Sequence, residues 1–188
     1  LVVGLIALWL TWLAVGQARV IGINFLLSLL ALVWVADIAA YFSGRALGGR
    51  FSREKLAPAI SPGKSWEGVW GGMAGVVVLA FAWEWADRAL GAEVPSFFSR
   101  LSVHSGLLLL ISVIFMSAMS VVGDLVESLI KRSAGVKDSS GLLPGHGGVL
   151  DRIDALLPTL PLGMMLVALV VAIVSVVGAQ LLVRDLDS

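Results

Sequence analysis

The chain has 188 residues, of which 59% are hydrophobic and only 14% are charged. Soluble domains average about 25% charged residues, and a soluble globule of this length could not bury so much apolar surface. The 13 basic and 13 acidic residues balance, which argues against nucleic acid as a partner. Cysteine is absent, which excludes disulfides, thiolate metal sites and cysteine nucleophiles. The composition therefore predicts an integral membrane protein.

Five apolar segments match the length of membrane-spanning helices, because a hydrocarbon core of about 30 Å needs about 20 residues. They cover residues 1–15, 20–42, 68–85, 103–130 and 157–183. The first segment is short and does not start with methionine, so we expect N-terminal helices of the full-length protein to be missing. The expected fold is an all-α polytopic membrane protein, with residues 1–188 forming a single membrane-embedded catalytic domain.

Two long polar connections, residues 43–67 and 131–156, fall on one side of the membrane because two spans separate them. Their basic residues are Arg45, Arg50, Arg53, Lys55, Lys64, Lys131, Arg132, Lys137 and Arg152. The basic residues assigned to the opposite side are Arg19, Arg88, Arg100 and Arg184. Cytoplasmic loops are enriched in Lys and Arg, so we expect both polar connections, and any site built on them, to face the cytoplasm.

Aromatic and glycine patterns predict packing rather than chemistry. Aromatic residues near the outer ends of the spans are expected to form an interfacial belt; they are Trp83, Trp85, Phe97 and Phe98. Glycines at the start of the third span are expected to allow close helix packing; they are Gly71, Gly72 and Gly75. On the outer side, we expect Asp87→Asn to change little.

Acidic residues inside the apolar segments point to a site, because a carboxylate at the bilayer centre costs at least ~2.5–3.5 kcal/mol. Asp37 shares a helix face with Tyr41, and Arg45 follows close by. An ordinary helix-end charge that reaches toward water is the alternative for Asp37. In the fourth span a stripe about 100° wide holds two acids, a hydroxyl and an ammonium; its members are Asp124, Glu127, Ser128 and Lys131. A simple Glu127–Lys131 pair would leave Asp124 unexplained.

The second polar connection combines glycines with acids. Gly147 and Gly148 beside His146 would let backbone N–H groups approach phosphate oxygens. Asp151 and Asp154 would face the same way on a helix. Oxygen ligands without cysteine favour Mg²⁺ or a similar hard cation, and carboxylates with Lys and Arg suit phosphoryl or nucleotidyl transfer. A solvated glycine-rich loop is the alternative.

The first polar connection holds a second candidate phosphate site between residues 61 and 68. Lys64 and Ser65 lie at a predicted helix N-terminus, with Glu67 in its first turn, and could hold an anion there. The segment lacks the Walker pattern, and plain helix capping is an equal alternative.

These motifs resemble those of the phosphatidate cytidylyltransferase family, also called the CDP-diacylglycerol synthase family. The stretch from Ser128 to Asp154 resembles its signature, with the KR, KD, HGG and DRxD elements at fixed spacing. Residues 37–48 are similar to its DxxAYxxGR-type element, and residues 61–68 to its SPxK[TS]xEG element. The resemblance implies a bacterial inner-membrane enzyme that converts CTP and phosphatidate into CDP-diacylglycerol and pyrophosphate, with Mg²⁺ required. A homodimer is a possible assembly.

The resemblance also implies roles for individual residues. Asp124 and Asp151 would be metal ligands, and Asp138 and Asp154 would serve a second shell or a second cation. Phosphate charge would be offset by Lys131, Arg132, Lys137 and Arg152. A substrate phosphate would meet Ser61, Lys64 and Ser65. His146 would position substrate rather than act as a base.

Two other functions are compatible with parts of this sequence. A CTP-dependent lipid-alcohol kinase would release CDP instead of pyrophosphate. A cation- or proton-coupled transporter could use Asp37, Asp124 and Glu127 as a relay. A transporter does not need the charged glycine-rich loop, so the sequence favours the transferase.

Overall fold

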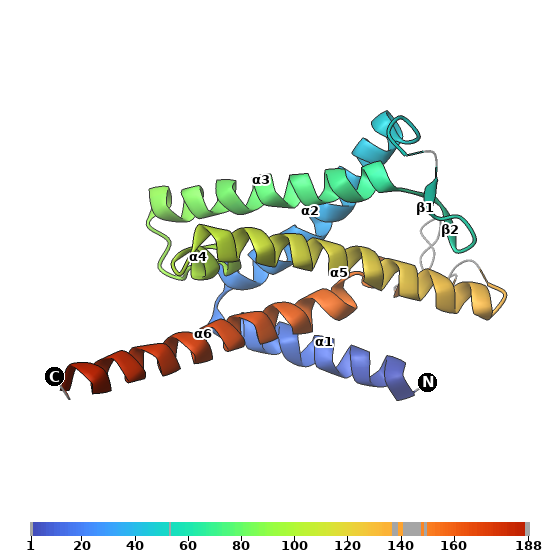
Figure 1. The fold of residues 1–188 in the computed structure, drawn as a ribbon. Helices are drawn as coiled ribbons and strands as arrows, with labels where there is room; N and C mark the ends of the chain where they lie inside the picture. Colours follow the sequence, from blue (N-terminus) through green and yellow to red (C-terminus); the bar gives the residue numbers. More distant parts are fainter. Residues whose placement is uncertain (1, 53, 137–138, 141–147, 149, 187–188) are drawn as a thin grey trace.

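The computed structural model of the chain describes residues 2–52, 54–136, 139–140, 148 and 150–186, and only the backbone of residues 152 and 177–186. Five long helices dominate it (Figure 1): α1 Val2–Ile21, α2 Ile23–Leu47, α3 Trp66–Leu90, α5 Gly106–Ser133 and α6 Leu156–Leu186. The shorter elements are β1 Lys55–Ala57, β2 Ser61–Ser65, α4 Phe97–Ser102 and the 3₁₀ turn η1 Leu150–Arg152. All five long helices are long and apolar enough to cross a membrane. The prediction of an all-α polytopic membrane protein is confirmed.

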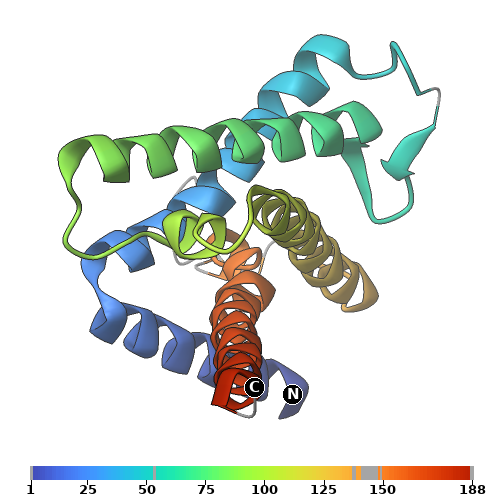
Figure 2. The same ribbon diagram turned by 60° about the vertical axis from the view of Figure 1, so that its left-hand side comes forward.

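The long helices run in alternating directions through the bundle. α3 packs along α2, α1 packs along α6, and α5 contacts both α3 and α6 (Figures 1 and 2). The end of α2, the β1–β2 hairpin, the start of α3, the end of α5 and the start of α6 gather at one end of the molecule, which we call the hairpin end. The end of α3, α4 and the start of α5 gather at the opposite end, which we call the α4 end. The described parts of the two polar connections therefore lie at one end of the molecule, as their spacing predicts.

Helices α2 and α3 approach each other through small residues. A Cβ added to Gly72 would lie 2.9 Å from the carbonyl oxygen of Ala36, and one added to Gly75 would lie 2.6 Å from Ala39 Cβ. One added to Gly71 would overlap the side chain of Ser43. The predicted glycine packing is confirmed, and a larger residue in this seam would push the two helices apart.

The aromatic residues of α4 belong to the core, so their assignment to an interfacial belt was wrong. Phe97 and Phe98 are fully buried, and the Phe97 ring packs edge-on against Phe25 with centroids 6.2 Å apart. The Phe97 N–H donates to Ser28 Oγ at 2.9 Å, which fixes α4 against α2. The chain between α3 and α5 thus folds inward as a short helix, whereas Trp85 stays 71% exposed.

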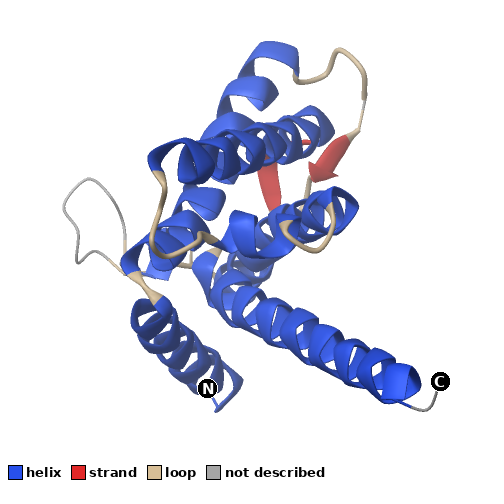
Figure 3. Cartoon of the chain, turned by 90° about the vertical axis from the view of Figure 1, so that its left-hand side faces the viewer, coloured by secondary structure: helices blue, strands red, loops and turns tan. Residues whose placement is uncertain are grey.

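The helix boundaries differ from the expected segments, and the hairpin was not predicted. α1 continues past residue 15 to Ile21, and Gly22 alone joins it to α2, with φ 151°. Strands β1 and β2 pair antiparallel, with Lys55 opposite Ser65 and Ala57 opposite Ser61 (Figure 3). These strands are too short to show an alternating pattern in sequence. The hairpin ends at Ser65, which is also the N-cap of α3.

Candidate functional site

An ion pair joins the hairpin to the membrane helix α5. Lys64 Nζ of β2 lies 2.5 Å from Asp124 Oδ2, and the two side chains are 23% and 35% exposed. Ser128, one turn further along α5, donates from its hydroxyl to Asp124 Oδ1 at 3.4 Å. Lys64 and Asp124, predicted from separate motifs, therefore meet at the hairpin end.

A second lysine lies between two carboxylates near the end of α5. Lys131 Nζ is 2.6 Å from Glu127 Oε2 and 2.7 Å from Asp151 Oδ1. All three side chains are less than one-fifth exposed, so the charges interact with little screening by water. The Glu127–Lys131 pair expected as the alternative for this stripe is present. Lys131 also contacts Asp151, so the group has three members.

Asp151 is held by the loop that precedes it as well as by Lys131. Its Oδ2 accepts a hydrogen bond from Gly148 N–H at 2.7 Å and one from the Ser139 hydroxyl at 3.0 Å, and Ser139 N–H also donates to it. Burial opposes ionisation of Asp151, but the hydrogen bonds from Lys131, Gly148 and Ser139 outweigh it and hold its pKa well below the usual range. Asp151 is therefore an anion at neutral pH. The Gly148 amide, expected to meet a phosphate, binds this carboxylate in the structure.

Three acids from three elements converge beside these lysines. Burial, with the negative charges of Asp124 and Asp37, raises the pKa of Asp154 to about 6, against a hydrogen bond from Ala155 N–H and the charge of Lys131. Asp37 comes from α2, Asp124 from α5 and Asp154 from the turn before α6, so their charges are close enough to repel. In the described part of the chain, no three acidic or imidazole groups form a ready-made metal cluster.

Ser65 and Glu67 make local hydrogen bonds at the start of α3 and to the segment before β1. Ser65 accepts the N–H of Gly68 at 3.2 Å, which is the capping alternative expected for this residue. Glu67 Oε1 accepts the N–H groups of Phe51 and Ser52 at 3.1 and 2.8 Å. Of this motif, Lys64 is the residue whose side chain contacts an acid, Asp124.

The remaining predicted residues lie around the same end. Arg132 Nε donates to the carbonyl oxygen of Ile60 at 3.4 Å, which ties α5 to the hairpin turn. Ser61 pairs with Ala57 in the hairpin. Arg45 donates to the hydroxyl of Tyr41 at 3.2 Å on the exposed side of α2. Lys137, Asp138, His146 and Gly147 lie outside the described residues, as does the side chain of Arg152.

Ser139 is a site residue that the sequence reasoning missed. Its amide and hydroxyl both bind Asp151. The only sequence signal was its place directly after the KD element, and a serine in a polar loop carries no periodic pattern.

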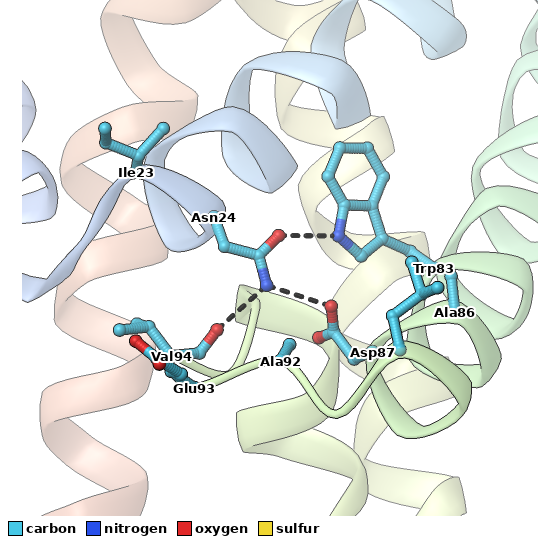
Figure 4. Close-up of a pocket in the computed structure, with 9 residues that line it drawn as sticks. Ile23, Asn24, Trp83, Ala86, Asp87, Ala92, Glu93 and Val94 are labelled. Atoms are coloured by element: carbon cyan, nitrogen blue, oxygen red, sulfur yellow. Dashed lines mark hydrogen bonds between the residues drawn. The ribbon is translucent and has the colours of Figure 1, made fainter.

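A cavity of about 600 Å³ lies at the α4 end, and its polar lining residues bind one another (Figure 4). Asn24 donates to Asp87 Oδ1 and to the Val94 carbonyl oxygen, both at 2.9 Å, and accepts from Trp83 Nε1 at 3.0 Å. Asp87 Oδ2 also accepts from Ser96 N–H at 3.0 Å and from the Ser99 hydroxyl at 2.6 Å. Asp87 therefore connects α2, α3 and α4, and it is a poor control position for a substitution expected to change little.

The chain is similar to known proteins over most of its length. A family model described as "Cytidylyltransferase family" matches residues 1–178. A phosphatidate cytidylyltransferase of Haemophilus influenzae is 51% identical over 142 residues, which cover 74% of this chain and 44% of that protein. Proteins of the same name from Pseudomonas aeruginosa and Staphylococcus epidermidis are 45% and 38% identical, over 73% and 78% of this chain and 45% and 50% of their own lengths. The chain thus spans half or less of these relatives.

Proposed function

The chain belongs to the cytidylyltransferase family, and from this premise we propose that the full-length protein is a phosphatidate cytidylyltransferase. It would transfer the cytidylyl group of CTP to phosphatidate and release pyrophosphate. Relatives of that name at 38–51% identity support this substrate pair. The comparisons give no support to the lipid kinase or to the transporter.

The observation that carries the proposal is the pairing of lysines with carboxylates at the hairpin end. Lys64 contacts Asp124, and Lys131 contacts Glu127 and Asp151, at 2.5–2.7 Å. A triphosphate and a lipid phosphate bring several negative charges, and lysines that turn from carboxylate to phosphate would stabilise them. Arg132, beside the hairpin turn, would add a third cation.

The chemistry of the carboxylates at the hairpin end suits Mg²⁺. Carboxylate oxygens are its preferred protein ligands, and the mutual repulsion of Asp37, Asp124 and Asp154 is what a divalent cation relieves. Asp124 and Asp151 are the proposed ligands, and Asp154, whose pKa is raised in part by the charge of Asp124, is proposed to serve a second shell or a second cation. Asp151 already accepts from Lys131, Ser139 and Gly148, so it would coordinate once Lys131 turns to phosphate. Bound Mg²⁺ would supply positive charge to the triphosphate oxygens.

The chemistry needs positioning more than proton transfer. A phosphate oxygen of phosphatidate attacks the α-phosphorus of CTP, a new P–O bond forms, and the bond to the β-phosphate oxygen breaks to release pyrophosphate. The nucleophile is already an anion, so the protein has no general base to supply. Lys64 and Lys131 would hold the two negative reactants together against their repulsion.

The proposed location is the inner membrane of a bacterium, with the hairpin end in the cytoplasm. The excess of Lys and Arg in the two polar connections supports this orientation. CTP is a cytosolic solute and a lipid headgroup stays at the membrane surface, so a site at the helix ends reaches both substrates without moving either across the bilayer.

The test is product analysis with the purified full-length protein in lipid–detergent micelles. With CTP, phosphatidate and Mg²⁺, ³¹P NMR is expected to show CDP-diacylglycerol and pyrophosphate in equal amounts. CDP as the nucleotide product with a lipid alcohol as acceptor would identify a kinase instead, and no CDP-lipid from any of the four nucleotides would overturn the proposal.

A further inference from the structure

Arg100 of α4 is a cation that the described part of the chain does not neutralise. No carboxylate there lies within 4.0 Å of its guanidinium nitrogens, and its Nε is buried without a hydrogen-bond acceptor. Its guanidinium carbon lies 5.4 Å from the centroid of the Phe25 ring, so the cation faces an aromatic ring. The site therefore holds a positive charge and a donor without an acceptor in the described residues.

Arg100 lines a cavity of about 220 Å³ together with two other polar residues, Ser99 and His104. An imidazole has an N–H donor in either protonation state. The rest of the lining is apolar and comes from Pro95, Leu101 and Val103 and, on α6, from Val167, Val170 and Val171. Val171 is 53% exposed, so the cavity is open along the surface of α6.

The cavity lies beside the start of one membrane-spanning helix and the middle of another. His104 precedes Ser105, the N-cap of α5, so Arg100 and His104 lie close to the end of that span. Val167 to Val171 lie 11 to 15 residues into α6, about 16 to 22 Å along a helix that runs from Leu156 to Leu186. A cation near the end of one span therefore shares a cavity with apolar residues inside another.

We propose that this cavity binds an anionic phospholipid from the leaflet at the α4 end, with its headgroup phosphate on Arg100 and an acyl chain along Val171. The positive charge of Arg100 and the apolar lining are both complementary to such a lipid. The site is distinct from the proposed catalytic site, because it lies at the other end of the bundle (Figure 1). It does not depend on the proposed function.

Arg88 shows why charge alone does not carry the proposal. It lies at the same end of the bundle, on α3, but its guanidinium is paired with Glu84 one turn earlier and its side chain is 74% exposed. The charge of Arg88 is therefore neutralised by its neighbour, and its remaining donors reach the surroundings of the protein. Arg88 is therefore the matched control for Arg100.

The test measures lipid retention by native mass spectrometry of the full-length protein, titrated with phosphatidylglycerol or phosphatidylcholine of the same acyl chains. The wild type is expected to retain one phosphatidylglycerol with about tenfold preference, as one charge-assisted contact provides. Arg100→Gln should remove that preference, Arg100→Lys should keep part of it, and Arg88→Gln should keep all of it.

A second variant separates binding from folding. Val171→Trp adds bulk at an exposed position of the wall, leaves Arg100 in place, and is expected to remove the retained lipid with no loss of melting temperature. Retention of phosphatidylglycerol by Val171→Trp or by folded Arg100→Gln would overturn the proposal. It would also be overturned if inorganic phosphate displaced the lipid at equal concentration, or if the wild type were a dimer that Arg100→Gln dissociates, because a second chain would then cover the cavity.

Discussion

Lys64 of strand β2 and Asp124 of helix α5 lie far apart in the sequence, yet their side-chain nitrogen and oxygen are 2.5 Å apart. The hairpin is thereby joined to a membrane helix by the same two groups that we propose act on substrate phosphate and metal. Within this ion pair, Lys64 holds the position proposed for the metal at Asp124, and Asp124 holds the position proposed for a substrate phosphate at Lys64. Catalysis would then begin with the exchange of this internal pair for substrate.

Asp124→Asn tests the proposed ligand. The change keeps the shape of the side chain but removes its charge, so we expect kcat to fall by at least about 100-fold with normal membrane insertion. The measurement is CMP incorporation into lipid over a range of Mg²⁺ concentrations. Glu54→Gln, an exposed acid at the same end of the bundle, is the control and should stay near wild type. Near-normal turnover of Asp124→Asn at low Mg²⁺ would remove Asp124 from the ligand set.

Lys131→Met tests the three-charge cluster. It leaves the Glu127 and Asp151 carboxylates without their shared cation, in surroundings less than one-fifth exposed, and should destabilise the protein by about 3 kcal/mol. Tryptophan fluorescence during heating in detergent would report a lower melting temperature. The double variant Lys131→Met/Glu127→Gln removes one unpaired charge and should recover part of that temperature but none of the activity. Equal melting of Lys131→Met and wild type would contradict this electrostatic account.

Asp154→Asn should stabilise the metal-free protein while impairing the enzyme. Asp154 is repelled by Asp124 and Asp37, so removal of its charge relieves the acid cluster. We expect a melting temperature in EDTA that is a few degrees above wild type, and a smaller rise on addition of Mg²⁺. A lower melting temperature in EDTA would contradict this account, because the Asn side-chain oxygen can still accept the hydrogen bond from Ala155 N–H.

Gly72→Ala tests the α2–α3 seam. The added methyl group would lie 2.9 Å from the Ala36 carbonyl oxygen, and backbone cannot move aside easily, so we expect a loss of about 1–3 kcal/mol. Gly16→Ala in α1 is the control, because nothing lies within 4 Å of its added carbon, and alanine there should be neutral or stabilising. The comparison uses melting temperatures of the two variants in the same detergent.

Asp87→Asn should lower stability without direct involvement in catalysis. Asp87 accepts from Asn24, Ser96 and Ser99, and an amide NH₂ in its place would face at least one of those donors. A loss of about 1–3 kcal/mol is expected, with kcat and KM of the folded fraction unchanged at low temperature. Glu93→Gln, an exposed acid in the loop beyond α3, is the control. A selective change in KM for CTP would contradict the placement of Asp87 at the far end from the site.

The sequence predicted the helices and one stripe of the site, because both follow from spacing along one helix. Apolar runs of about 20 residues give the spans, and the 3.6-residue period places Asp124, Glu127 and Lys131 on one face. The contact of Lys64 with Asp124 could not be predicted this way, since it depends on how a hairpin folds back over α5. The same holds for the Ser139 contacts with Asp151.

Phe97 shows a second limit of hydropathy in membrane proteins. Lipid and protein core are both apolar, so an aromatic residue near a helix end has the same composition signal in either place. The hydrogen bond from Phe97 N–H to Ser28, and the turn that lets α4 form, decide that Phe97 is in the core. Only a tertiary contact distinguishes the two environments.

The size of the residues in the glycine seam between α2 and α3 is expected to affect the position of the Lys64 side chain outside the membrane. Helix α3 begins immediately after Ser65, and Ser65 directly follows Lys64, so the lysine moves with the helix. Gly72 is eight residues from Lys64 and lies about 9 Å along α3 from Trp66, the first residue of that helix. A seam wider by one methyl group would nevertheless shift the Lys64 ammonium relative to Asp124. Differences among homologues at seam positions should therefore show as differences in substrate affinity as well as in heat tolerance.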